Sequence, residues 1–292
     1  AAAATTVWLM MIFGFALTSG LAGKFLDPYA PEKVILISGV ISVVAIAITS
    51  LALYRLEGVD LENKIINTNQ KVPFKTALKE ILTDPDTKRF TIFIFLSMLA
   101  FSAQDLILEP FAGIIFKYTL GETTSLSGIQ HSGVLTGMLL VAVCGSSRLR
   151  RFFGSLRSWM IYGCLASALA MFGLVIAGIL EGEWPLRLNV FILGLANGAF
   201  SIAAIASMMR LAVVGGSGKE GVRIGLWGGA QAIAFGLGGL LGAAASDLAR
   251  SLFANAAWAY ASVFFLEAIL FVASAYMASL VERKSSNEIK VG

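Results

Sequence analysis

The sequence predicts an all-α integral membrane protein with eight transmembrane helices. Hydrophobic residues make up 57% of the chain and charged residues 14%, whereas about one-quarter of the residues of a soluble domain are charged. The apolar residues are also gathered into eight runs of about 20 residues, the length that an α-helix needs to cross a bilayer. The predicted spans are 6–26, 33–54, 90–117, 129–145, 157–180, 188–213, 223–245 and 255–280.

The basic residues predict how these helices are oriented. If the polar segment 55–89 is cytoplasmic, 17 of the 22 Lys and Arg residues lie on the cytoplasmic side of the membrane, in agreement with the positive-inside rule. The C-terminus is then cytoplasmic as well. Because this asymmetry also accounts for the net charge of +4, we expect membrane lipid around the chain and no nucleic-acid partner.

The order of the spans divides the chain into three parts. Two spans occupy 1–54, a long polar segment follows at 55–89, and six spans occupy 90–292. This order resembles the major facilitator superfamily, in which a long cytoplasmic loop separates two six-helix halves. On that template the sequence is truncated at its N-terminus, and its spans correspond to helices five to twelve of a major-facilitator-type helix bundle.

The long polar segment contains a predicted surface helix. Phe74, Leu78 and Ile81 recur at spacings that place them on one helix face, and Pro73 suits a first helical turn. We expect residues 73–83 to lie flat on the cytoplasmic leaflet, with the apolar face in the headgroup boundary.

Glycine residues four positions apart predict where helices touch each other. Small residues at this spacing let the backbones of membrane helices approach closely. The rows are Gly133 with Gly137, Gly194 with Gly198, Gly238 with Gly242, and Gly221 with Gly225 and Gly229. We expect each row to lie at a helix contact.

The third span carries the most specific candidate site. Gln104, Asp105 and Glu109 interrupt an otherwise apolar segment. Leaving such groups in hydrocarbon costs several kcal/mol, so they usually face a bundle interior, a cavity or a partner. Asp105 and Glu109 are four residues apart and share one helix face, and two carboxylates so close in a low-dielectric setting do not both ionise easily.

The expected neighbours of these carboxylates are polar groups on the fourth or the seventh span, such as Gln130, His131 or Gln231. His131 is the only histidine of the chain, and we predict it at the extracytoplasmic start of the fourth span. A neutral imidazole can ligate the magnesium of a chlorophyll-type tetrapyrrole or carry a proton. A polar residue satisfied at the membrane interface is the simpler interpretation.

Glu267 is a further candidate, in the eighth span. It lies about twelve residues from the start of this span, which is near mid-membrane at the rise of an α-helix. Its neighbours in sequence are apolar, so we expect it to point into the bundle. It is either a proton site or a structural hydrogen-bond partner, with Gln231 or Asn197 as the expected partner.

Several of these residues belong to longer motifs. The motifs are Gln104-Asp105-x-x-Leu108-Glu109-Pro110-Phe111-x-Gly113, Gly121-Glu122-Thr123-Thr124 at the start of the next helix, Trp8-Leu9-Met10-Met11-Ile12 leading to Leu26-Asp27-Pro28-Tyr29, Gly225-Leu226-Trp227-Gly228-Gly229-Ala230-Gln231-Ala232, and the last helix with Glu267. Together they resemble the PucC/LhaA family over nearly the whole chain.

The resemblance implies a function as well as a fold. That family is a branch of the major facilitator superfamily of photosynthetic bacteria, and it is implicated in assembling light-harvesting complexes and delivering chlorophyll or bacteriochlorophyll. We therefore expect an intracytoplasmic, plasma or thylakoid membrane of a photosynthetic bacterium. The expected partners are light-harvesting apoproteins and pigment-synthesis enzymes. We expect no enzyme activity and no metal beyond the magnesium of a pigment cargo. The candidate residues for contact with pigment or substrate are Gln104, Asp105, Glu109, His131, Gln231 and Glu267.

Two other functions stay open at this point. A proton-coupled major-facilitator transporter of a small solute would use Asp105, Glu109 or Glu267 as its proton carrier. Such transporters place coupling sites near the midplane, whereas we predict Asp105 past the middle of its span, toward the outer face. A pure scaffold would dock light-harvesting apoproteins without touching pigment.

Overall fold

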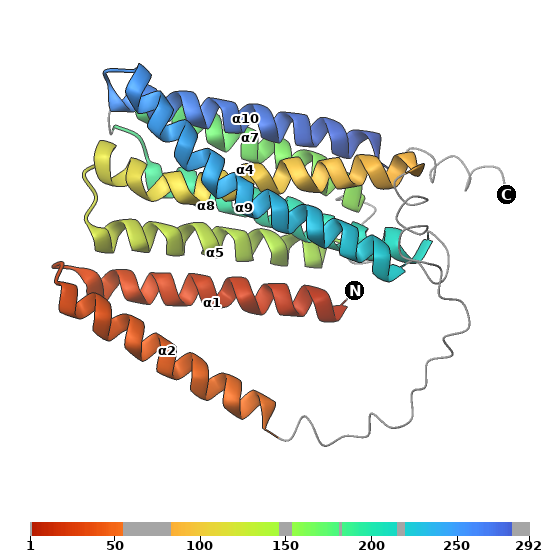
Figure 1. Cartoon of the computed structure of the whole chain (residues 1–292), viewed down its shortest axis with the longest axis horizontal. Helices are drawn as coiled ribbons and strands as arrows, with labels where there is room; N and C mark the ends of the chain where they lie inside the picture. Colours follow the sequence, from red (N-terminus) through yellow and green to blue (C-terminus); the bar gives the residue numbers. More distant parts are fainter. Residues whose placement is uncertain (1, 55–82, 146–153, 181–182, 215–219, 282–292) are drawn as a thin grey trace.

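The structure, a computed structural model, describes residues 2–54, 83–145, 154–180, 183–214 and 220–281. These residues form eight long helices and no strand (Figure 1). The helices are α1 (Ala2–Leu26), α2 (Pro31–Leu53), α4 (Pro85–Ile115), α5 (Leu120–Cys144), α7 (Leu156–Ile179), α8 (Leu186–Val214), α9 (Glu220–Leu252) and α10 (Ala256–Leu280). Each is long and apolar enough to cross a membrane, so the predicted all-α fold with eight transmembrane helices is confirmed. The predicted surface helix at 73–83 lies outside the described residues, apart from its last residue, as does most of segment 55–89.

Polar caps make two helices begin earlier than their apolar runs predict. α4 begins directly after Asp84, whose carboxylate accepts hydrogen bonds from the Thr87 backbone nitrogen at 3.3 Å and the Thr87 hydroxyl at 2.5 Å. α5 begins at Leu120, nine residues before the predicted span. Thr119 and Glu122 form a capping box there, with N–O distances of 3.2 and 3.0 Å. The apolar run of α5 is therefore only the second part of its helix.

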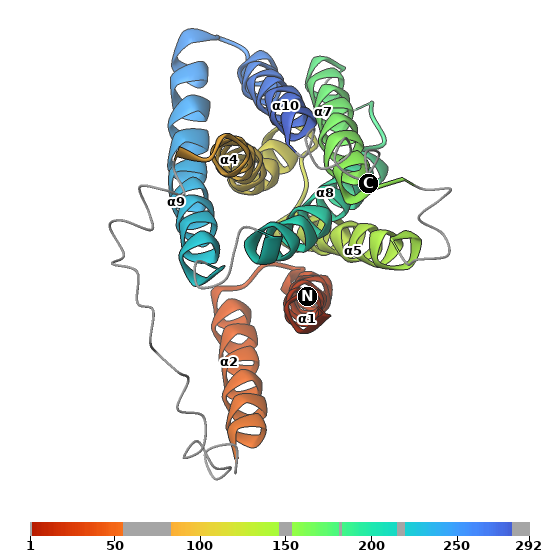
Figure 2. The ribbon, with the colours of Figure 1, turned by 90° about the vertical axis from the view of Figure 1, so that its right-hand side faces the viewer.

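Six helices form a bundle, and the first two lie along one side of it. Within the bundle α4 packs on α9 and α10, α7 packs on α8 and α10, and α5 packs on α8. α1 lies along α5, and α2 extends away from the bundle with α1 as its main contact (Figure 2). α2 has no buried residue. Following the orientation predicted from the basic residues, we call the end where α1 turns into α2 the outer end, and the opposite end the inner end.

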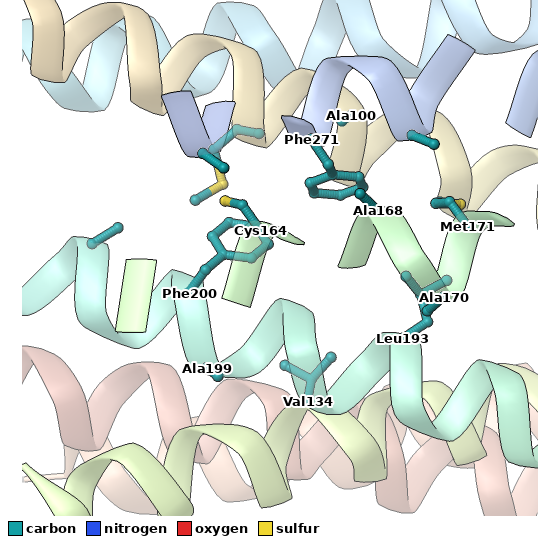
Figure 3. Close-up of a cluster of buried hydrophobic side chains, with 14 of the residues drawn as sticks. Ala100, Val134, Cys164, Ala168, Ala170, Met171, Leu193, Ala199, Phe200 and Phe271 are labelled. Carbon is teal, nitrogen blue, oxygen red and sulfur yellow. The ribbon is translucent and has the colours of Figure 1, made fainter. Parts of the chain in front are cut away.

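The apolar core between α7, α8 and α10 holds the bundle together. Phe200 of α8 and Phe271 of α10 are fully buried, and their ring centroids lie 5.8 Å apart in an edge-to-face arrangement (Figure 3). Cys164 and Met171 of α7 belong to the same buried cluster. This core fixes α8, and α8 in turn supports α5.

Four glycine residues bring α5 and α8 into backbone contact, and we call Gly133, Gly137, Gly194 and Gly198 the α5–α8 seam. A Cβ atom added to any of the four would overlap a backbone carbonyl oxygen of the other helix. Small residues at this spacing allow such an approach where no side chain separates the two helices. The prediction of a helix contact is confirmed for both of these rows.

The two glycine rows of α9 differ from each other. Gly238 and Gly242 lie against the backbone of α4, as predicted. No described atom outside the helix's own backbone and the adjacent residues lies within 4 Å of where a Cβ of Gly221, Gly225 or Gly229 would be. These three residues instead line an apolar groove of about 780 Å³ between α4 and α9. In the part of the chain that the structure describes, this row therefore lies at no close helix contact, because small residues permit such a contact without providing the force that makes it.

Asp27, in the turn between α1 and α2, binds the N-terminal end of α5. Its Oδ2 atom accepts a hydrogen bond from Thr119 Oγ1 at 2.6 Å, and its Oδ1 atom accepts one from the Gly121 backbone nitrogen at 3.3 Å. The helix dipole stabilises a carboxylate at this position. Gly23 and Gly121 also leave no room for a Cβ where α1 and α5 meet. These contacts fasten α1 to α5 at the outer end.

Candidate functional site

Two carboxylates of α4 meet two polar side chains of α5. Gln130 Nε2 donates a hydrogen bond to Asp105 Oδ1 at 2.5 Å, and Ser127 Oγ donates one to Glu109 Oε1 at 2.6 Å. The helices run in opposite directions, so one turn of α4 is matched by one turn of α5. We call Asp105, Glu109, Ser127, Gln130 and His131 the α4–α5 polar patch. Its carboxylates face α5, as expected from their cost in lipid.

His131 completes the patch. Its Nδ1 atom lies 2.8 Å from the Ser127 carbonyl oxygen, so Nδ1 carries the proton and the lone pair of the neutral ring is on Nε2. The ring packs edge-to-face on Phe15 of α1, with centroids 5.4 Å apart. Ser127 therefore connects His131 and Glu109, because its carbonyl accepts from one and its hydroxyl donates to the other.

The depth of His131 differs from the prediction. His131 is not at the start of its helix: α5 begins at Leu120, so His131 lies about 17 Å along the helix axis, near the middle. Asp105 lies beside Gln130, 20 residues after the start of α4 and 10 before its outer end, so it is past the middle of its helix, toward the outer end, as predicted. The error for His131 came from starting the fourth span at its apolar run, whereas the capping box starts the helix.

Gln104 is buried next to the patch but makes no hydrogen bond within the described residues. Its side chain is 1% exposed, and both its amide nitrogen and its amide oxygen lack a partner there. It lies close enough to Asp105 for a weak hydrogen-bonding interaction with that carboxylate.

Glu267 of α10 is a second buried polar side chain, outside the patch. It is 3% exposed, and neither carboxylate oxygen has a hydrogen-bond partner in the part of the chain that the structure describes. The hydrogen bond expected with Asn197 is not formed: the Asn197 side-chain oxygen accepts one from Ser167 Oγ at 2.7 Å, and its side-chain nitrogen has no partner within the described residues. Glu267 lies within electrostatic range of Asp105.

Gln231 does not join the patch, so the neighbours of the carboxylates come from the fourth span and not from the seventh. α4 and α9 run parallel, and Ser102 Oγ donates to the Phe235 carbonyl oxygen at 2.8 Å. Gln231 precedes Phe235 by one turn, whereas Asp105 follows Ser102 by about one turn. The two side chains are therefore offset by about seven residues, or about 10 Å along the bundle. Gln231 is half-buried on α9.

Sequence reasoning missed Ser127 and Phe15. Ser127 lies in a polar stretch before the apolar run, where a serine carries no specific signal. Its position one turn before His131 could have indicated a bond to the ring, because residues four apart are neighbours on a helix. Phe15 is one of many apolar residues in α1, and only the packing of α1 on α5 identifies it.

The patch offers a small set of chemical groups. No group of three His, Cys, Asp or Glu side chains that could hold a metal ion occurs among the described residues. The patch has carboxylate oxygens that already accept one hydrogen bond each, and one imidazole nitrogen with a lone pair. These groups suit hydrogen bonding to a ligand and a single contact to a metal that another molecule already holds.

Comparison with known proteins gives the family. The family model described as "PUCC protein" matches residues 1–286. The chain is 46% identical over 285 residues to the "Bacteriochlorophyll synthase 44.5 kDa chain" of Rhodobacter capsulatus, covering 96% of this chain and 64% of that protein. It is 26% identical over 285 residues to "Protein PucC" of the same organism, covering 95% of this chain and 60% of that protein. It is 29% identical over 233 residues to "Protein PucC" of Cereibacter sphaeroides, covering 79% and 48%.

The match extends through α1 and α2 as well as through the six-helix bundle. The chain spans between 48% and 64% of the length of these three relatives, and the family model covers all eight helices. The resemblance seen in the motifs of α4 and α5 is thus confirmed. The chain belongs to the PucC family.

Proposed function

We propose that the chain is part of a membrane assembly factor that binds chlorophyll or bacteriochlorophyll and delivers it to light-harvesting apoproteins. The observation that carries the proposal is the α4–α5 polar patch, a cluster of ligand and hydrogen-bonding groups near the middle of an apolar helix bundle. Intramembrane ionisable residues are costly and usually functional. A lipid-soluble tetrapyrrole with a magnesium ion and ring carbonyls is a cargo that this patch suits.

The relatives support the same class of cargo. The name of one relative contains the word bacteriochlorophyll, and the three relatives come from photosynthetic bacteria. That name also contains the word synthase. We assign this chain no covalent chemistry, because the patch suits binding and transfer. Pigment-synthesis enzymes would then act as donors of the cargo and light-harvesting apoproteins as its acceptors.

Pigment analysis tests this proposal. The whole protein that contains this chain would be purified from its photosynthetic host, and its organic extract would be examined by absorption spectroscopy. We expect chlorophyll or bacteriochlorophyll in defined proportion to protein, above the amount carried by a control membrane protein of similar size. Pigment at the control level contradicts the proposal. Apoproteins that copurify without pigment would favour a scaffold that only docks them.

A second candidate function, a proton-coupled secondary transporter, is favoured by the depth of Glu267. Glu267 is buried near the middle of α10, and Asp105 lies within its electrostatic range. Transporters of this type have coupling sites near the midplane. Uptake of a soluble solute into vesicles under a proton gradient, abolished by Asp105→Asn, would favour this function over pigment delivery.

A further inference from the structure

We infer that His131 Nε2 is the axial ligand to the magnesium of the tetrapyrrole, and that Ser127 is the positioning residue for this ligand; the inference rests on the proposed function. A magnesium ion held by four ring nitrogens takes a further axial ligand, which a protein side chain can supply. Neutral imidazole is a common metal ligand. Among the described residues, His131 is the only imidazole that could take this role.

The hydrogen bond of the ring sets which nitrogen binds. Ligating histidines commonly donate their second ring N–H to a carbonyl or carboxylate, which fixes the tautomer and the ring orientation. His131 already has this arrangement, because Nδ1 lies 2.8 Å from the Ser127 carbonyl oxygen. Nε2 is on the far side of the ring from that carbonyl, and so it is directed away from the α5 backbone.

The His131 ring is only partly covered by its neighbours. His131 is half-buried, and the ring of Phe15, its neighbour on α1, is 50% exposed. Asp105 of α4 lies within electrostatic range of His131. A tetrapyrrole that approaches between α1 and α4 would therefore meet an aromatic side chain together with the ligand nitrogen.

The carboxylates of the patch have a different role in this arrangement. Asp105 and Glu109 each hold a hydrogen bond from α5, so they tie the two helices together beside the ligand. The Ser127 hydroxyl is bonded to Glu109, whereas the Ser127 carbonyl is bonded to His131. Removing the hydroxyl should consequently leave the carbonyl, and with it the orientation of His131, in place.

A matched pair of variants on α5 tests the assignment. His131→Gly removes the ligand and leaves space for free imidazole, whereas Thr136→Ala removes only a hydroxyl outside the patch, which donates to the Ser132 carbonyl oxygen of its own helix. The probe is bacteriochlorophyll a, added to the purified whole protein in detergent. Binding is measured by titration, and the absorption bands that respond to the coordination number of magnesium report the axial ligand. Circular dichroism and size-exclusion chromatography confirm that each variant is folded.

We expect the wild type and Thr136→Ala to bind pigment with the same coordination signature. His131→Gly should bind at least about tenfold more weakly and without this signature, and added imidazole should restore both. If wild type and His131→Gly bind with equal affinity and the same spectrum, the assignment of His131 is overturned while the proposed function stands. If the wild type binds no pigment, the proposed function fails, and the assignment fails with it. Recovery with imidazole separates loss of the ligand from damage to the fold.

Discussion

The α4–α5 polar patch and Glu267 place carboxylates at similar depth in the bundle but in opposite surroundings. In the patch, Asp105 and Glu109 are half-buried and each accepts a hydrogen bond across a helix boundary. Glu267 is almost fully buried, and no hydrogen bond to it occurs in the described part of the chain. A bonded and accessible carboxylate can hold helices together and exchange its partner for a ligand. A buried carboxylate without a partner only costs stability, unless it serves a function.

The largest expected effect comes from removing the donor to Asp105. Gln130→Leu leaves this carboxylate without its hydrogen bond inside the membrane, which should lower the free energy of unfolding by about 2–3 kcal/mol. Unfolding in detergent, followed by circular dichroism, measures the change. The matched control is Gln231→Leu on α9, which lies outside the patch and should change stability much less. Equal effects of the two variants would mean that the Gln130–Asp105 bond does not stabilise the bundle.

Substitution of Glu267 should raise the free energy of unfolding, whereas Gln130→Leu lowers it. Glu267→Met removes a buried polar group that has no hydrogen bond, so we expect the free energy of unfolding to rise by about 1–2 kcal/mol. Glu267→Gln, which keeps the shape and a polar group, should gain less. The same unfolding measurement applies. A clear loss of stability in Glu267→Met would show that the carboxylate has a stabilising partner and would remove the contrast with the patch.

Glu109 tests whether hydrogen bonding or charge matters within the patch. Glu109→Gln keeps an oxygen that accepts the bond from Ser127, whereas Glu109→Leu does not and should cost about 1–2 kcal/mol. In a photosynthetic host that lacks the native protein, we expect the Gln variant to support assembly of light-harvesting complexes and the Leu variant to fail. Absorption spectra of the membranes report assembly. Equal performance of both variants would show that neither the bond nor the charge of Glu109 is needed.

Substitution of Asp27 should change the free energy of unfolding least. It provides a reference value for a carboxylate outside the bilayer interior. Asp27→Ala removes two hydrogen bonds at the N-terminal end of α5, and we expect a loss of about 0.5–1 kcal/mol, typical of a capping interaction. Asp27→Asn should retain part of this. A loss as large as that of Gln130→Leu would mean that the outer-end contacts, rather than the patch, dominate the packing of α5.

Much of the fold and part of the site could be predicted from the sequence. The cost of carboxylates in lipid and the four-residue spacing of Asp105 and Glu109 correctly place both against a neighbouring helix. The depth of His131 was wrong, because an apolar run marks the membrane span but a cap marks the start of the helix. The possible contact between Gln231 and the carboxylates is absent for another reason. The register between two helices depends on how their side chains interlock, and one sequence without that packing does not contain it.

The α5–α8 seam has a mechanical consequence for the patch. Gly133 follows His131 by two residues, which is about 200° around the helix axis, so the seam and the histidine lie on nearly opposite sides of α5. With backbone against backbone, α5 is locked against torsion about its own axis. The seam thus fixes the direction in which the His131 imidazole points. A bulky residue at Gly133 would rotate α5 and change the orientation of the imidazole, although no residue of the patch would have been substituted.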